Sequence, residues 1–183
     1  MSDILPRDGA PQEPELVSLL PDDARLSVAA VSYYVSSELR TLEANWDVEG
    51  WNALIANPES ANEEIDRISK FVEHGKGLAT KLTDHSERPD EPMSLTDDDL
   101  VLFGFALFRF GNAGYAHAVN ALDKITVADP GHARALLDAR RQQTARIFSG
   151  LQPTAENRGI EWMVWSSDIA TRLGHIAVQA PGE

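Results

Sequence analysis

The chain has 183 residues, a formal net charge of −13 at pH 7 and no cysteine. The lack of cysteine excludes disulfides, thiolate metal sites and cysteine nucleophiles. The acidic excess argues against nucleic acid as a partner, because nucleic-acid binding depends on neutralising phosphates.

The length suits one domain, which at this size buries roughly 70% of its unfolded surface. Apolar residues make up 43% of the chain and charged residues 25%, which is ordinary for a globular protein. No run approaches the ~20 apolar residues of a membrane span. The N-terminus lacks the basic-then-apolar pattern of a signal peptide. We therefore expect a cytoplasmic protein with no membrane partner.

The charge is unevenly distributed along the chain. Residues 1–58 carry −7, residues 59–99 carry −7 and residues 100–183 carry +1. An acidic front half beside a near-neutral back half has two interpretations. It steers a basic partner, or it serves solubility alone.

The first 20 residues contain Pro6, Gly9, Pro11 and Pro14, which favours a mobile, extended N-terminal segment. The apolar residues at its end either clip onto a groove of this or a neighbouring subunit, or lead into the first helix. A helix over residues 22–44 follows, because apolar residues recur there at helical spacing: Val28, Val31, Val35, Leu39 and Leu42.

Residues 45–55 predict a short helix or helical turn in which Trp46 and Trp51 act as core wedges. Residues 62–83 predict another helix, which Gly75 and Gly77 interrupt. The HGKG motif at residues 74–77 lacks the strand, spacing and hydroxyl residue of a phosphate loop, so we do not expect phosphate binding there.

Residues 84–92 are polar, acidic and contain two prolines, which predicts a loop. The SLTD motif at residues 94–97 is typical of a capping box with Asp in place of Glu. Asp97, Asp98 and Asp99 favour a helix start, because carboxylates stabilise the free N–H groups at that end.

Residues 99–130 predict an α-hairpin. From 100 to 110 only Gly104 and Arg109 are not apolar, so this helix must be covered on more than one side. GNAG at residues 111–114 predicts a break, because glycine tolerates the positive φ that ends a helix. The second run carries an apolar stripe. Asp129 and Pro130 predict the start of the next helix.

The hairpin resembles a tetratricopeptide repeat, a helix-turn-helix unit of about 34 residues. Ala106 matches the small residue at the helix crossing, and Tyr115 and Ala118 match the aromatic and small residues of the second helix. Leu122 and the Asp129-Pro130 pair complete the match, whereas Arg109 departs from the family's usual aromatic residue.

The resemblance implies a binding surface along the first helix of the pair and on the helix that follows. The implied partner-binding residues are Leu100, Phe103, Leu107, Phe110, Arg134, Leu137 and Arg141. Either a partner covers this apolar groove, or another helix of the same chain does.

After the hairpin, residues 130–149 predict a helix that carries the one basic stretch of the chain. Residues 150–159, which include Pro153, predict a loop. Residues 160–178 predict an amphipathic last helix that shields the core, with Ile160, Met163, Val164, Ile169, Leu173 and Ile176 on a stripe and Trp162 and Trp165 beside it.

No catalytic motif is present. The five histidines show no metal-ligand spacing. No nucleophile elbow and no dinucleotide-binding glycine motif occurs. We expect no cofactor, no metal and no enzymatic activity, and an enzyme whose site is assembled from distant residues stays as an alternative.

The sequence thus predicts an all-α fold. It is a helical bundle or a short right-handed α-solenoid of six to seven helices, similar to tetratricopeptide-repeat proteins. We expect a mobile segment at 1–20, one domain at 21–179 and a tail at 180–183. The expected function is that of an adaptor or chaperone-like module that binds a protein or peptide segment, since small acidic helical-repeat proteins resemble bacterial secretion chaperones. The alternative is an assembly subunit that uses the same surface to form a homo-oligomer.

Overall fold

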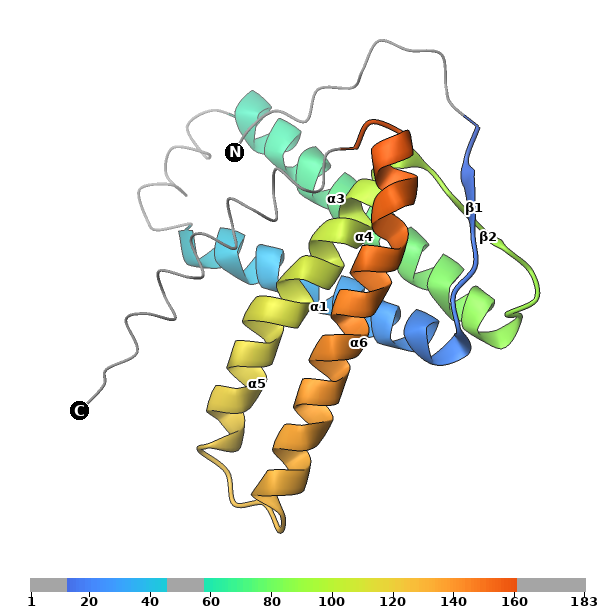
Figure 1. Ribbon diagram of the computed structural model, residues 1–183. Coiled ribbons are helices and arrows are strands. Elements are labelled where there is room, and N and C mark those ends of the chain that lie inside the picture. The colour runs from blue at the N-terminus through green and yellow to red at the C-terminus, as the bar shows by residue number, and fades with distance from the viewer. Residues whose placement is uncertain (1–12, 46–57, 161–183) are drawn as a thin grey trace.

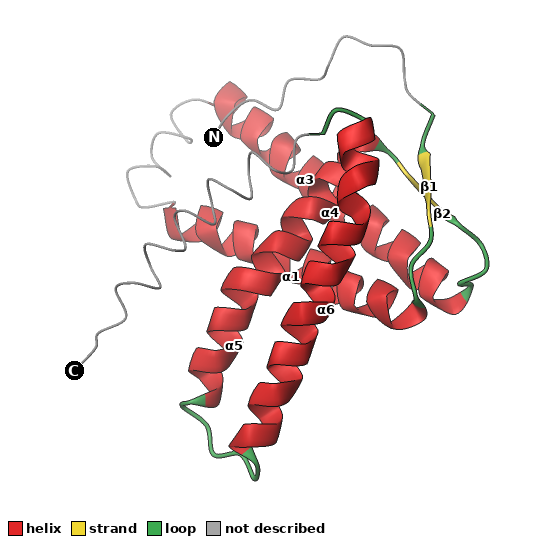
Figure 2. Ribbon diagram, in the orientation of Figure 1, coloured by secondary structure: helices red, strands yellow, loops and turns green. Residues whose placement is uncertain are grey.

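The computed structural model describes residues 13–45 and 58–160. Most of these residues are helical, which confirms the all-α prediction. The helices form two layers that cross each other (Figure 1). Figure 2 shows how little strand accompanies them.

The lower layer consists of α1 (Pro21–Asn45) and α3 (Pro58–Glu87), which pack against each other. The expected interruption at Gly75 and Gly77 is wrong, because α3 runs through both residues. Gly75 instead serves the packing: a Cβ atom there would lie 2.5 Å from Cγ2 of Val35 on α1. The glycine marks the close approach of two helices rather than the end of one.

The upper layer begins with α4 (Asp97–Arg109), whose N-cap is Thr96. The backbone N–H of Asp99 donates to Oγ1 of Thr96 over 3.2 Å, and the backbone N–H of Thr96 donates to Oδ2 of Asp99 over 2.9 Å. This is a capping box. The prediction of a box at residues 94–97 is therefore wrong by two positions, because Ser94 belongs to a strand.

The expected break at residues 111–114 is wrong. These residues belong to a π-helix, η1 (Phe110–Gly114), that joins α4 to α5 (Tyr115–Leu122) without a turn. The N–H of Tyr115 bonds the carbonyl of Phe110 five residues back. Because Gly114 and its neighbours keep right-handed helical dihedrals, glycine's access to positive φ is not used here. The chain reverses only between 122 and 130, so the hairpin that carried the repeat resemblance is not formed where expected.

The long helix α6 (Pro130–Asn157) returns beside α5 and α4 (Figure 1). Its predicted start is confirmed: Oδ1 of Asp129 accepts the N–H of His132 over 2.9 Å, and Pro130 occupies the first turn. The predicted loop at 150–159 is wrong, because the helix passes through Pro153.

The end of the N-terminal segment pairs with a second strand. Strand β1 (Glu15–Val17) pairs antiparallel with β2 (Met93–Leu95), and Val17 lies opposite Met93. The buried His85 holds the chain that follows β1: its Nε2 accepts the N–H of Leu19 over 2.9 Å, and its Nδ1 lies 2.8 Å from the carbonyl oxygen of Glu91. The expectation of a mobile segment is therefore wrong for residues 15–19.

The core lies between the layers and beneath the strand pair. Its largest fully buried side chain is Phe103, and it is otherwise built mainly from aliphatic groups: Val31, Leu78, Leu82, Leu95, Leu100 and Leu107. Partly buried aromatic rings extend it, with Tyr34 stacked on Phe105 at a centroid separation of 6.1 Å.

Several predictions fall outside the described residues, namely the beginning of the N-terminal segment, the Trp46–Trp51 helical turn, the last helix and the tail. Within the described residues, no helix has both the length and the apolar character needed to cross a membrane.

Candidate functional site

The seven predicted partner-binding residues divide into two groups. Leu100, Phe103 and Leu107 are at most 1% exposed and form the centre of the core. The prediction that they line a groove open to a partner is wrong, because the chain's own elements cover them. Phe110 is half-buried at the π-helix. The rest lie farther out, on α6: Arg134, Leu137 and Arg141.

These outer residues belong to a projection that the sequence did not reveal. No residue from 108 to 143 is buried, although the structure describes all of them and most are helical. This stretch, which we call the finger, contains the end of α4, η1, α5, the connection and the first half of α6. It extends beyond the crossing with α1 and α3 (Figure 1). A pair of helices without a buried residue lacks a core of its own.

The apolar side chains of the finger are either partly buried or exposed. Val119 and Leu122 on α5 and Leu137 on α6 are half-buried where the two helices pack. Ile125 is 60% exposed and Leu136 is 53% exposed. Two of the five large apolar side chains that are exposed among the described residues thus lie on the finger.

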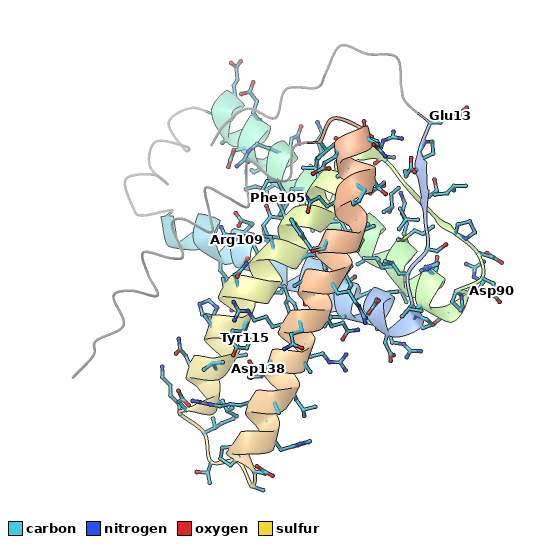
Figure 3. The ribbon with its side chains drawn as sticks, viewed as in Figure 1. Glu13, Asp90, Phe105, Arg109, Tyr115 and Asp138 are labelled. Atoms are coloured by element: carbon cyan, nitrogen blue, oxygen red, sulfur yellow. The ribbon has the colours of Figure 1, made fainter. Side chains whose placement is uncertain are left out.

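Polar contacts hold the two helices of the finger together. The hydroxyl of Tyr115 donates to Oδ1 of Asp138 over 2.5 Å, and Figure 3 shows the two side chains facing each other between α5 and α6. The hydrogen bond to Asp138 raises the pKa of Tyr115 above its ordinary value. The guanidinium carbon of Arg141 lies 4.8 Å from the centroid of the Tyr115 ring, a cation–π contact. At the tip, Arg134 pairs with Asp123 over 2.7 Å.

The π-helix forms the base of the finger. Nδ2 of Asn112 donates to the carbonyl oxygen of Phe108 over 2.9 Å. This bond satisfies a carbonyl near the point where the α-helical hydrogen-bond pattern gives way to the π-helical one. Tyr33 of α1 packs edge-to-face on Phe110, and its hydroxyl lies 3.0 Å from Nδ1 of His117. The base is thus fixed to α1 while the rest of the finger extends outward.

The finger is basic in an acidic protein. It carries five basic groups (Arg109, Lys124, Arg134, Arg140 and Arg141) and three acidic groups (Asp123, Asp129 and Asp138), a net charge of +2 against −13 for the chain. Two of these basic groups are paired with carboxylates, Arg109 with Glu38 of α1 and Arg134 with Asp123.

The buried carboxylates Asp99 and Asp23 connect helices of the fold. Asp99 accepts from Nζ of Lys81 over 2.7 Å and from Nε2 of His74 over 3.0 Å, which fastens α4 to α3. Burial alone would raise the pKa of Asp99, but the hydrogen bonds from His74, Lys81 and Thr96 outweigh it and hold the pKa well below the ordinary value. Asp23 likewise accepts from Gln143 and Arg146 of α6, at 2.7 Å each.

The described residues contain no group of three or more His, Asp or Glu side chains that could hold a metal ion. Comparisons with protein-family models, with characterised proteins and with solved structures found no match. The geometry of the finger alone makes it the candidate site. It includes four of the predicted partner-binding residues: Phe110, Arg134, Leu137 and Arg141. No sequence signal defined its limits, because its helices have the same apolar spacing as core helices.

Proposed function

We propose that the protein is an interaction module whose finger binds an acidic, amphipathic helical segment of a partner protein. The observation that supports this most is the finger's lack of any buried residue together with its exposed Ile125 and Leu136. A third helix laid along α5 and α6 would give these side chains a core, in the manner of helix-in-groove recognition. The basic groups of the finger favour acidic residues at the rim of such a helix.

Two matched substitutions test the proposal. Leu136→Glu puts a charge on the finger, and Leu16→Glu does the same at an exposed leucine of β1, outside the finger. Both side chains are exposed, so neither change should cost more than about 0.5 kcal/mol of stability. We expect proteins that co-purify with the wild type from its native host, identified by mass spectrometry, to be lost with Leu136→Glu and kept with Leu16→Glu. An unchanged set of proteins with all three forms would reject the finger as the binding surface.

Self-association is a second candidate, and one observation favours it. Residues 59–73 of α3 carry five acidic and two basic groups, a net charge of −3, and Ile65 among them is 55% exposed. This surface on one copy complements the finger on another.

The complementarity makes a distinct prediction for mass measured by light scattering. A dimer should dissociate on Arg140→Glu and re-form when Glu63→Arg is added, because the reversed pair restores the attraction. A monomer at every concentration and salt level would leave the finger to a foreign partner.

A further inference from the structure

We infer that β1 binds an extended, basic segment of a partner protein, which adds to the strand pair as a third strand. This surface is separate from the finger, so the two surfaces bind their partners independently. Three features of β1 support strand addition: an outer edge with free backbone groups, exposed leucines beside that edge, and acidic residues around the strand pair.

β1 is the outer strand of the pair. β2 packs against α3 and α4, whereas β1 has β2 as its main neighbour. Figure 1 shows the pair at the side of the molecule, away from the tip of the finger. A sheet of two strands leaves each strand with one edge unpaired, and here the helices pack on the β2 side. Within the described residues, the far edge of β1 therefore has no strand beside it.

Leu16 turns its backbone N–H and C=O away from β2. Hydrogen-bonded and non-bonded pairs alternate along an antiparallel ladder. Bonds from Leu16 to β2 would place the next bonded pairs at Pro14 and at Pro92, and neither proline has an N–H. The N–H of Thr96, opposite Pro14, already bonds Oδ2 of Asp99 over 2.9 Å. The ladder is therefore bonded through the residues on either side of Leu16, whose own N–H and C=O face outward.

Two exposed leucines lie beside this free edge. Leu16 is 66% exposed and Leu20 is 63% exposed, so two of the five exposed large apolar side chains among the described residues lie here. The side chain of Leu16 lies on the same face of the pair as that of Ser94, which is also exposed. An added strand would place an apolar side chain opposite Leu16 on that face.

The surroundings of the strand pair are strongly acidic. Residues 13–20 and 84–98 carry eight acidic groups and one basic group, and Arg158, which pairs with two of these acids, brings the net charge to −6. Glu13 and Asp90, labelled in Figure 3, are exposed and have no ion pair within the described residues. This potential attracts a basic segment.

The charge decides between a second copy and a basic partner. Two copies paired through β1 would bring together two surfaces of charge −6, and like charges repel. Acidic side chains and a proline at a strand edge, here Glu13, Pro14 and Glu15, also prevent such self-pairing. A segment in which Lys or Arg alternates with apolar residues has the opposite charge and supplies an apolar face for Leu16.

A synthetic peptide tests the inference. We would titrate acetyl-Lys-Val-Lys-Val-Lys-Val-Lys-amide into the full chain and follow the binding by NMR. Chemical-shift changes should concentrate at residues 13–20, and hydrogen exchange at the Leu16 amide should slow because its free N–H becomes bonded. No shift at 13–20, or shifts confined to the acidic residues 59–73 of α3, would overturn the inference. The same peptide with glutamate in place of lysine should not bind, and equal binding would reject a basic partner.

Methylation of the peptide backbone separates strand addition from attraction by charge. The valines lie opposite Leu16, so N-methylation of the valines removes donors that face β1 and should weaken binding about tenfold. N-methylation of the lysines removes only N–H groups that point to solvent and should leave the affinity nearly unchanged. Equal effects of the two methylated peptides would overturn strand addition.

Matched charge substitutions locate the acidic surface. Glu13→Gln combined with Asp90→Asn should weaken peptide binding roughly fivefold, whereas Glu63→Gln combined with Asp66→Asn removes the same charge from α3 and should change it little. All four side chains are exposed, and circular dichroism verifies that both variants stay folded. Equal weakening by the two pairs would mean that the net charge of the protein, rather than the edge of β1, attracts the peptide.

The finger supplies the last control. Leu136→Glu should leave peptide binding unchanged, and loss of binding would place the peptide on the finger and overturn the inference. An edge of this length makes few backbone bonds, so its partner binds too weakly to survive purification. The proteins that co-purify therefore report the finger alone, and either surface can fail its test without the other.

Discussion

Gly75 illustrates how one residue sets the packing of the lower layer. Gly75→Ala would place Cβ 2.5 Å from Cγ2 of Val35, and valine cannot move away easily because its branched side chain has few rotamers. We expect the substitution to lower the free energy of unfolding by about 1–3 kcal/mol, as overpacking does. Denaturant unfolding measures the change.

Gly77→Ala is the control, because a Cβ atom there would meet nothing within 4 Å. Alanine should raise stability by about 0.5–1 kcal/mol, since it favours the helix over the unfolded chain. Val35→Ala should reduce the cost of Gly75→Ala by making room. Equal effects of alanine at the two glycines would show that α1 and α3 do not approach each other at Gly75.

Asp99 gives a pH-dependent prediction. Its pKa in the folded protein is held below the unfolded value of about 3.9, so its ionised form stabilises the fold above that pH. The contribution is lost as pH falls below about 4 towards the lower folded pKa. Asp99→Asn should cost about 1–3 kcal/mol at pH 7, a range that allows for solvent screening of the partly exposed Lys81 and His74.

The pH dependence supplies the check on Asp99. Thermal unfolding at several pH values should show a constant difference between wild type and Asp99→Asn above about pH 5, and a shrinking one below about pH 4. A difference that does not change with pH would mean that the ionised carboxylate contributes nothing.

At this scale the sequence predicted one helix cap correctly, misplaced another by two residues, and predicted burial poorly. Asp129 and Pro130 were assigned correctly because capping depends on residues close in the chain. Leu100, Phe103 and Leu107 were recognised as apolar, but an apolar face looks the same whether its neighbours come from this chain or from a partner. Asp99 acquires partners 18 and 25 residues away, which no local pattern encodes.

Among the elements, α6 carries an internal proline that makes it weaker than its length implies. Pro153 has no N–H to bond the preceding turn, and a proline in a helix interior costs about 3 kcal/mol. The side chain is exposed. Pro153→Ala should therefore raise the free energy of unfolding by about 1–3 kcal/mol, measured by denaturant unfolding, and a decrease would place the residue in a non-helical segment, as the sequence predicted.

The buried imidazole of His85 contacts the backbone beside both strands, at Leu19 and Glu91. His85→Leu removes the acceptor of the Leu19 N–H and the group beside the Glu91 carbonyl, which leaves both backbone groups unpaired. We expect a loss of about 1–3 kcal/mol and faster hydrogen exchange at residues 15–19 than in the wild type. Unchanged exchange there would show that pairing with β2 alone holds β1 in place.

Helix existence was predictable and helix continuity was not. The long periodic runs over α1 and α3 identified both helices to within a few residues. Glycine and proline then misled the prediction in three places, because each also occurs inside helices when neighbours pack closely or when the cost is small. Strands of three residues, such as β1 and β2, are too short for an alternating pattern to reveal.

For the molecule as a whole, the contrast between core and finger predicts unequal local stability. Backbone amides beside the fully buried side chains of α4 should exchange only through global unfolding. The finger has no buried residue to stabilise it against local opening. Native-state hydrogen exchange should give residues 100–107 opening free energies close to the global value and residues 115–140 clearly smaller ones. Equal protection of both stretches would mean that the finger is as tightly packed as the core.

The π-helix has a genetic consequence. Each residue of an α-helix turns the chain by about 100°, whereas a π-turn holds one residue more than an α-turn. One residue inserted at the start of α5 would therefore rotate Tyr115 away from Asp138 and leave α4 in the core. Loss of one residue from 110–114 would instead convert the π-turn into an α-turn and keep α5 nearly in phase.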